Sequence, residues 1–141
     1  MLGYLPIIKS SNISEKRSQN FKNIVRETFH KSFEIILEPL KTCNDGIELS
    51  IGDKTFSFIL KVSVIIADWP EASTFCLTYK SSNSNNPCHF CLVTRNNLAV
   101  LNLSEENILP RTHENMKESW ELNFGKSVSI ENISNYFWNL S

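Results

Sequence analysis

Apolar residues first recur at three- and four-residue steps in the stretch 15–42. This spacing places them on one face of an amphipathic helix, which we expect over residues 15–38. Ser14 is a suitable N-cap for this helix, and Pro39 is expected to end or kink it. His30 lies off the apolar stripe, so we expect it on the solvated face. The stripe consists of Phe21, Ile24, Val25, Phe29, Phe33, Ile36, Leu37 and Leu40.

The pattern then changes to alternation, which is typical of strands. Residues 47–51 alternate between apolar and polar after an Asn-Asp-Gly turn signal at 44–46, and a Gly-Asp pair supplies the next turn. The run 55–67 is rich in Phe, Ile and Val on both faces, as in a strand that is covered on both sides. We therefore expect a hairpin and a long core strand over 44–68, with Asp68 at the carboxyl end of that strand.

The remainder of the chain is expected to hold shorter elements around a polar loop. The candidates are a helix from Pro70 to about Lys80, a short strand at 98–103, and helices at 111–122 and 128–139. These elements divide the rest of the chain into a segment with a helix and a Cys-x-x-Cys knuckle, residues 69–118, and a helical tail, residues 119–141.

The composition is typical of one soluble globular domain spanning residues 1–141. Hydrophobic residues make up 41% and charged residues 21% of the 141 positions, which is enough apolar side chain for a core. The formal net charge of −1 gives no overall attraction to nucleic acid. Residues 1–42 carry seven Lys or Arg against four acids, a balance that suits either contact with phosphate or a solvated helix face.

No run of the chain approaches the roughly 18 consecutive apolar residues of a membrane span. The first nine residues, MLGYLPIIK, lack the charged start and the apolar core of a secretory signal. We therefore expect a nuclear or cytoplasmic protein that is not secreted and does not contact a membrane. Cysteines in such a chain favour thiols or a metal site over a disulfide framework.

Asp68 is the first residue that could carry chemistry. An acid at the carboxyl end of a buried strand lies where α/β folds place ligand groups, and a carboxylate there is a suitable oxygen ligand for Mg²⁺. Two such ions can stabilise the attacking and leaving oxygens of a phosphodiester. The alternative is structural, because the same side chain could cap the helix that begins near Pro70.

Cys88 and Cys91 have the spacing of half a zinc site, in which a tight turn lets both thiolates face one ion. Zinc requires four ligands, and no second Cys pair follows. His113 is a conceivable further ligand. A redox pair is a weaker interpretation, because no strand precedes and no helix follows the pair in the thioredoxin order.

The stretch IIADWPEA, the polar loop after it and PCHFCLV together resemble Plavaka-type transposases of fungi, in the CACTA-like group of DDE transposases. In that family a hydrophobic strand ends in Asp, followed by an aromatic residue, Pro and often Glu. A Cys knuckle lies shortly downstream. The Asn-Asp-Gly turn and the stretch LPRTHENM fit the same pattern less specifically, and the resemblance covers about residues 44–118.

The resemblance implies an RNase H-like core in which three acids hold two Mg²⁺ ions for DNA strand cleavage and transfer. Asp68 matches the second acid, and Cys88 and Cys91 match a structural zinc knuckle. The first acid belongs on an earlier strand than this chain contains, and the third normally lies well beyond its length. Glu121 and Glu131 have no claim to that role beyond being acidic. We therefore expect a partial RNase H-like core of α/β or α+β class, a fragment that is inactive alone.

Three functions remain open on the sequence. The first is this transposase-derived domain, with DNA as its partner and either the rest of a transposase or a second copy covering it. The second is a small zinc-binding module for interaction or DNA binding, built on the Cys pair. The third is a plain globular domain whose motifs arise by chance.

Overall fold

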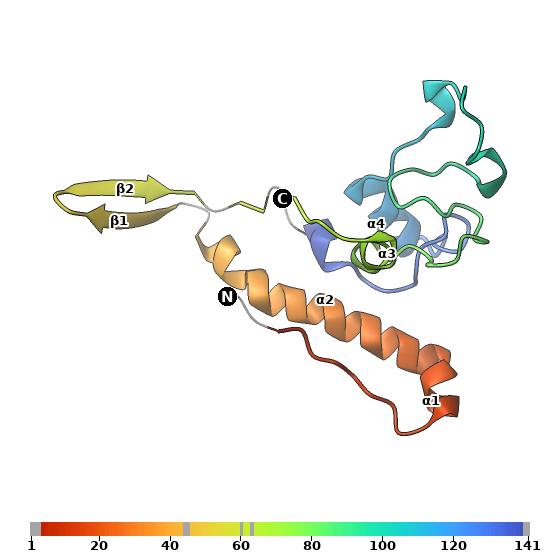
Figure 1. Cartoon of the computed structure of the whole chain (residues 1–141), viewed down its shortest axis with the longest axis horizontal. Helices are drawn as coiled ribbons and strands as arrows, with labels where there is room; N and C mark the ends of the chain where they lie inside the picture. The colour runs from red at the N-terminus through yellow and green to blue at the C-terminus, as the bar shows by residue number, and fades with distance from the viewer. Residues whose placement is uncertain (1–3, 44–45, 60, 63, 140–141) are drawn as a thin grey trace.

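The computed structural model describes residues 4–43, 46–59, 61–62 and 64–139. The chain is of α+β class, with a group of helices and irregular segments at one end and a small two-stranded antiparallel sheet at the other (Figure 1). The α-helices are α1 (Ile13–Arg17), α2 (Gln19–Thr42), α3 (Trp69–Cys76) and α4 (His113–Glu121), the strands are β1 (Ile47–Ile51) and β2 (Lys54–Phe58), and the 3-10 helices are η1 (Arg95–Asn97), η2 (Glu105–Asn107) and η3 (Tyr136–Asn139).

The expected amphipathic helix is present, but its limits differ from the prediction. Ser18 adopts an extended conformation, which separates α1 from α2, and its hydroxyl accepts the Phe21 N–H at 3.1 Å as the N-cap of α2. Pro39 does not end the helix, which continues to Thr42. The last turn packs on the core, with Leu40 against the buried cluster around Tyr136, and this packing offsets the backbone hydrogen bond that a proline removes.

The hairpin is confirmed, whereas the long core strand is wrong. Strands β1 and β2 pair antiparallel, with Ile51 opposite Lys54 across the two-residue turn. The turn signal at 44–45 and the positions 60 and 63 lie outside the described residues. Beyond Phe58, the described residues up to Asp68 form no strand.

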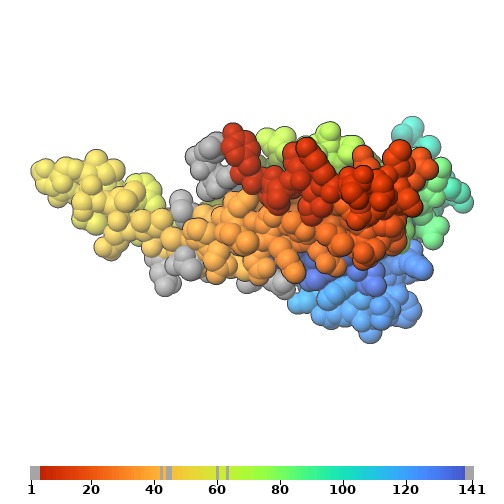
Figure 2. Space-filling model, turned by 90° about the horizontal axis from the view of Figure 1, so that it is seen from below, coloured from red at the N-terminus to blue at the C-terminus, as the bar shows by residue number. Residues whose placement is uncertain are grey.

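The physical reason is that a strand needs a partner, and no neighbouring strand pairs with this segment in the described parts of the chain. Its described Val and Ile side chains are all exposed, from 43% at Ile65 to 91% at Ile66. The hairpin likewise projects from the rest of the molecule (Figures 1 and 2). The residues of this segment thus have the composition of a strand, but the described chain provides no strand for them to pair with.

The core is built where α2 meets α3 and the C-terminal segment. Leu37, Tyr136 and Phe137 form a buried cluster, and Phe33 and Phe75 pack against it with ring centroids 5.2 Å apart. A second cluster joins α4 to the same segment: Met116, Ile130 and Trp138 are buried, and Cys76, Trp120 and Val128 pack on them.

His30 contradicts the expectation of a solvated residue, because it is only 3% exposed. Its Nε2 lies 3.2 Å from the Thr74 carbonyl oxygen, and its Nδ1 accepts the Tyr136 N–H at 3.4 Å. The ring also packs on Phe29 and Phe137. These two hydrogen bonds compensate its burial and explain how a polar residue enters an aromatic core.

Several shorter elements differ from the prediction. The helix after Asp68 ends at Cys76 because Leu77 takes a left-handed φ of 55°, and the helix at 113–121 is confirmed. The predicted strand at 98–103 is irregular, and the predicted helix at 128–139 is only the short η3. Within the described residues, none of the helices has the length and hydrophobicity that a membrane crossing requires.

Candidate functional site

Asp68 occupies the N-cap of α3. Its Oδ1 accepts the Glu71 N–H at 2.8 Å, and Pro70 fills the first turn, so the sequence DWPE forms a local helix start. The side chain is exposed, and its second carboxylate oxygen has no protein partner among the described residues. The structural interpretation of Asp68 is therefore confirmed, and the free oxygen remains available to another ligand.

Cys88 and Cys91 lie together in a tight turn that a buried asparagine holds. The Asn86 side chain donates to the Leu92 carbonyl at 2.6 Å, which closes the turn around the two thiols. The Phe90 N–H points at the Cys88 sulfur, 3.3 Å away. Burial raises the pKa of the Cys91 thiol, and the neighbouring Cys88 raises it further.

Arg111 is the residue of this site that sequence reasoning missed. Its guanidinium donates to three backbone carbonyls, those of Cys88 at 2.8 Å, Asn86 at 2.9 Å and Val128 at 2.7 Å. It thereby ties the thiol turn to the C-terminal segment. Burial lowers the pKa of Arg111, and the nearby thiols act in the opposite direction. The only sequence signal was a basic residue directly after Pro110.

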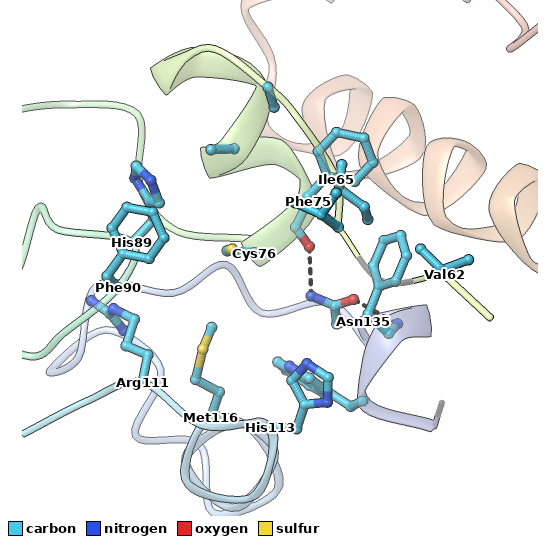
Figure 3. Close-up of a pocket in the computed structure, with 15 residues that line it drawn as sticks. Val62, Ile65, Phe75, Cys76, His89, Phe90, Arg111, His113, Met116 and Asn135 are labelled. Carbon is cyan, nitrogen blue, oxygen red and sulfur yellow. Dashed lines mark hydrogen bonds between the residues drawn. The ribbon is translucent and has the colours of Figure 1, made fainter. Parts of the chain in front are cut away.

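The described residues do not complete a zinc site. No group of three His, Cys, Asp or Glu side chains within the described ranges is arranged to hold a metal ion. His113 opens α4 and lies across a cavity from His89 and Phe90 of the thiol turn (Figure 3). His89 is enclosed between the rings of Trp69 and Phe90, with centroids 4.6 and 4.2 Å away. The two thiols are donors of the right kind, and they account for half of a tetrahedral set.

The cavity itself is a mostly apolar hollow of about 570 Å³. Figure 3 shows Val62 and Ile65 of the unpaired segment on one side and Arg111 and Met116 on the other, with Cys76 between. The segment before Asp68 and the thiol turn thus face the same space. The cavity joins the two motifs that the sequence singled out.

The two further acids lie apart from Asp68. Glu121 ends α4 and is exposed. Glu131 is half-buried and pairs with Arg26 of α2, its Oε1 lying 2.5 Å from the guanidinium. Burial raises the pKa of Glu131, while Arg26 acts in the opposite direction. Among the described residues, neither carboxylate belongs to a group of three or more His, Cys, Asp or Glu side chains that could hold a metal ion.

The model of the family described as Plavaka transposase matches residues 1–140 of the chain. No curated protein and no solved structure matches the chain.

Proposed function

Because the chain belongs to the Plavaka transposase family, we propose that it is the remnant of a metal-dependent DNA strand-cleavage and strand-transfer core. It binds DNA in the nucleus and does not cleave it alone. The observation that carries this proposal is the family match over residues 1–140. Within that match, Asp68 is the residue whose sequence context resembles that of the second acid of the family.

In this proposal Asp68 is one ligand of a two-metal site of the DDE type. Two divalent ions would stabilise the attacking and leaving oxygens of the phosphodiester when the site is complete. Asp68 contributes one carboxylate oxygen and keeps α3 in place through the other. A single carboxylate cannot hold two ions, so the isolated chain is expected to be inactive.

The fold of the remnant is proposed to be part of an RNase H-like sheet. The exposed apolar residues of the hairpin and of the segment before Asp68 support this proposal, because such faces are covered in a complete domain. Ile51 and Phe56 on the hairpin and Val64 and Ile66 on the segment are the clearest examples. The rest of a transposase or a second copy of the chain would cover them.

The experiment is a cleavage assay on labelled duplex DNA with Mg²⁺. We expect intact strands with the wild type, with Asp68→Asn and with Asp53→Asn, a control at an exposed aspartate of the hairpin turn. Robust cleavage that is lost in Asp68→Asn and kept in Asp53→Asn would overturn the inactivity and would identify a complete site.

A second function, a small zinc-binding module, is favoured by the contact between the Cys88 and Cys91 thiols. Zinc there would fix the thiol turn, and His113 is the further ligand that the sequence offers. This function predicts one zinc per chain by elemental analysis, lost in Cys88→Ser and kept in Cys43→Ser. A stable chain without zinc would rule the module out.

A further inference from the structure

A second hollow lies beside the N-terminal end of α2. The hairpin follows the other end of that helix (Figure 1). The hollow has a volume of about 780 Å³ and is walled by the first turns of α2, by residues 79–81 and by residues 123–132. Unlike the cavity beside the thiol turn, it is lined largely by polar and charged side chains. We call it the basic groove, after its cations Lys22, Arg26, Lys80 and Lys126.

The charges of the basic groove do not balance. Glu131 is the single acid among the lining residues, and it pairs with Arg26. Lys22, Lys80 and Lys126 have no carboxylate oxygen within 4 Å, as far as the described ranges reach. The groove therefore presents three uncompensated positive charges in a chain whose formal net charge is −1.

The fold assembles this cluster from distant parts of the sequence. Lys22 comes from α2, Lys80 follows α3, and Lys126 follows α4. Burial raises the pKa of Glu131, whereas the charges of Lys22 and Lys80 lower it. Both lysines therefore lie within electrostatic reach of the Glu131 carboxylate. No run of basic residues in the sequence reveals the cluster.

Other features of the groove also favour an anion. The first turn of α2 holds no acid, and the positive end of the helix dipole adds to the lysine charges there. Asn23, Ser81 and Asn132 supply neutral donors along the wall. Arg26 Nη1 is enclosed and has no acceptor among the described residues, so this guanidinium keeps an unused donor.

We propose that the basic groove binds the phosphodiester backbone of duplex DNA. Phosphate contacts of Lys and Arg supply most of the sequence-independent affinity of DNA-binding proteins, and amide and hydroxyl donors position the strand. The three lysines lie on three separate segments of the groove wall, and phosphodiester groups are the anions that the DNA of the proposed function supplies. This inference rests on the proposed function, because it names the surface that holds the DNA of that proposal.

The test compares two triple variants of the full chain. The groove variant is Lys22→Gln, Lys80→Gln and Lys126→Gln. The control is Lys9→Gln, Lys54→Gln and Lys61→Gln, three exposed lysines outside the groove. Both variants lose the same charge, and circular dichroism checks that both fold. Fluorescence anisotropy with a short labelled duplex then gives the affinity over a series of salt concentrations.

The groove variant should bind about 10- to 100-fold more weakly near ~0.1 M salt, and its salt slope should fall by about 2–3, because about three phosphate contacts are lost. The control should bind like the wild type. Inorganic phosphate and polyglutamate, added at matched ionic strength, should compete poorly with the duplex.

Each other outcome has a distinct meaning. If both variants lose duplex affinity equally, or if the groove variant loses none, the basic groove is not the DNA-binding surface. The proposal that the chain binds DNA would then still stand. Efficient competition by inorganic phosphate or by polyglutamate would overturn duplex DNA as its ligand. A wild type that binds no duplex at low salt would overturn the DNA partner of the proposed function, and the groove with it.

Discussion

At the scale of single residues, His30 shows how a buried polar group holds distant segments together. The Tyr136 N–H donates to Nδ1, so Nδ1 carries no proton and Nε2 donates to the Thr74 carbonyl. Burial lowers the pKa of His30 to about 4, and the hydrogen bond to Thr74 opposes this shift only in part. Neutral His30 is therefore part of the folded state.

Acidification should destabilise the chain through this residue. Between pH 6.5 and about 4 the unfolded state binds a proton at His30 and the folded state does not, so the free energy of unfolding falls as pH falls. The full effect is up to about 3 kcal/mol. Urea denaturation at several pH values should show a steeper loss for the wild type than for His30→Gln. His113→Gln, at an exposed histidine, should follow the wild type. If the free energy of unfolding falls equally with pH in the wild type and in His30→Gln, His30 is not the source of the acid sensitivity.

Asp68 allows its structural and chemical roles to be separated. Asp68→Ala removes the cap of α3 and should cost about 1 kcal/mol of stability. Asp68→Asn keeps an oxygen that can accept the Glu71 N–H, so it should unfold nearly as the wild type does. Thermal or urea denaturation measures both. A loss in Asp68→Asn as large as that in Asp68→Ala would show that the charge, and not the cap, stabilises this position.

At the scale of elements, the hairpin is the part of the chain with the least support. Strands β1 and β2 contact each other, and their apolar side chains, such as Leu49 and Phe58, are largely exposed. An isolated two-stranded sheet is marginally stable in water. The helices α2 and α4, by contrast, bury residues in the two core clusters.

Hydrogen exchange should report this difference directly. The amides of β1 and β2 are expected to exchange much faster than those of the middle of α2, because local opening of the hairpin breaks no core contact. The amide of Glu131, which donates to the Leu77 carbonyl at 2.7 Å, should be among the slow ones and serves as the reference. Equal protection of the hairpin and of Glu131 would mean that the hairpin is covered in solution.

What the sequence could predict depends on how local each signal is. The helix α2, the hairpin turn and the cap at Asp68 involve neighbours along the chain, and these predictions were confirmed within a few residues. The predicted apolar face of α2 was confirmed only in part, because Ile24 and Val25 are exposed. The strand before Asp68 failed because its apolar pattern records burial that the described chain does not supply. The prediction from sequence was wrong for His30, and there was none for Arg111, because their hydrogen-bond partners lie far away along the chain. The partners of His30 are 44 and 106 positions away, and those of Arg111 are 17 to 25 positions away.

At the scale of the whole molecule, the structure divides into a packed part and an uncovered part. The packed part contains the thiol turn, the cap at Asp68 and the basic groove. The uncovered part is the hairpin, which projects in Figure 2, together with the segment that follows it, whose described Val and Ile side chains are exposed. The chain belongs to the Plavaka transposase family. Under the proposed function, the packed part would hold DNA in the basic groove, and the uncovered part would be covered by the rest of a transposase or by a second copy of the chain.

The most direct test of this account is strand cleavage measured on a duplex that the protein has saturated. The duplex is incubated with Mg²⁺ at a protein concentration where anisotropy shows full binding, and its strands are then resolved under denaturing conditions. The account predicts bound DNA with both strands intact. Cleaved strands that depend on Mg²⁺ and disappear in Asp68→Asn would contradict it.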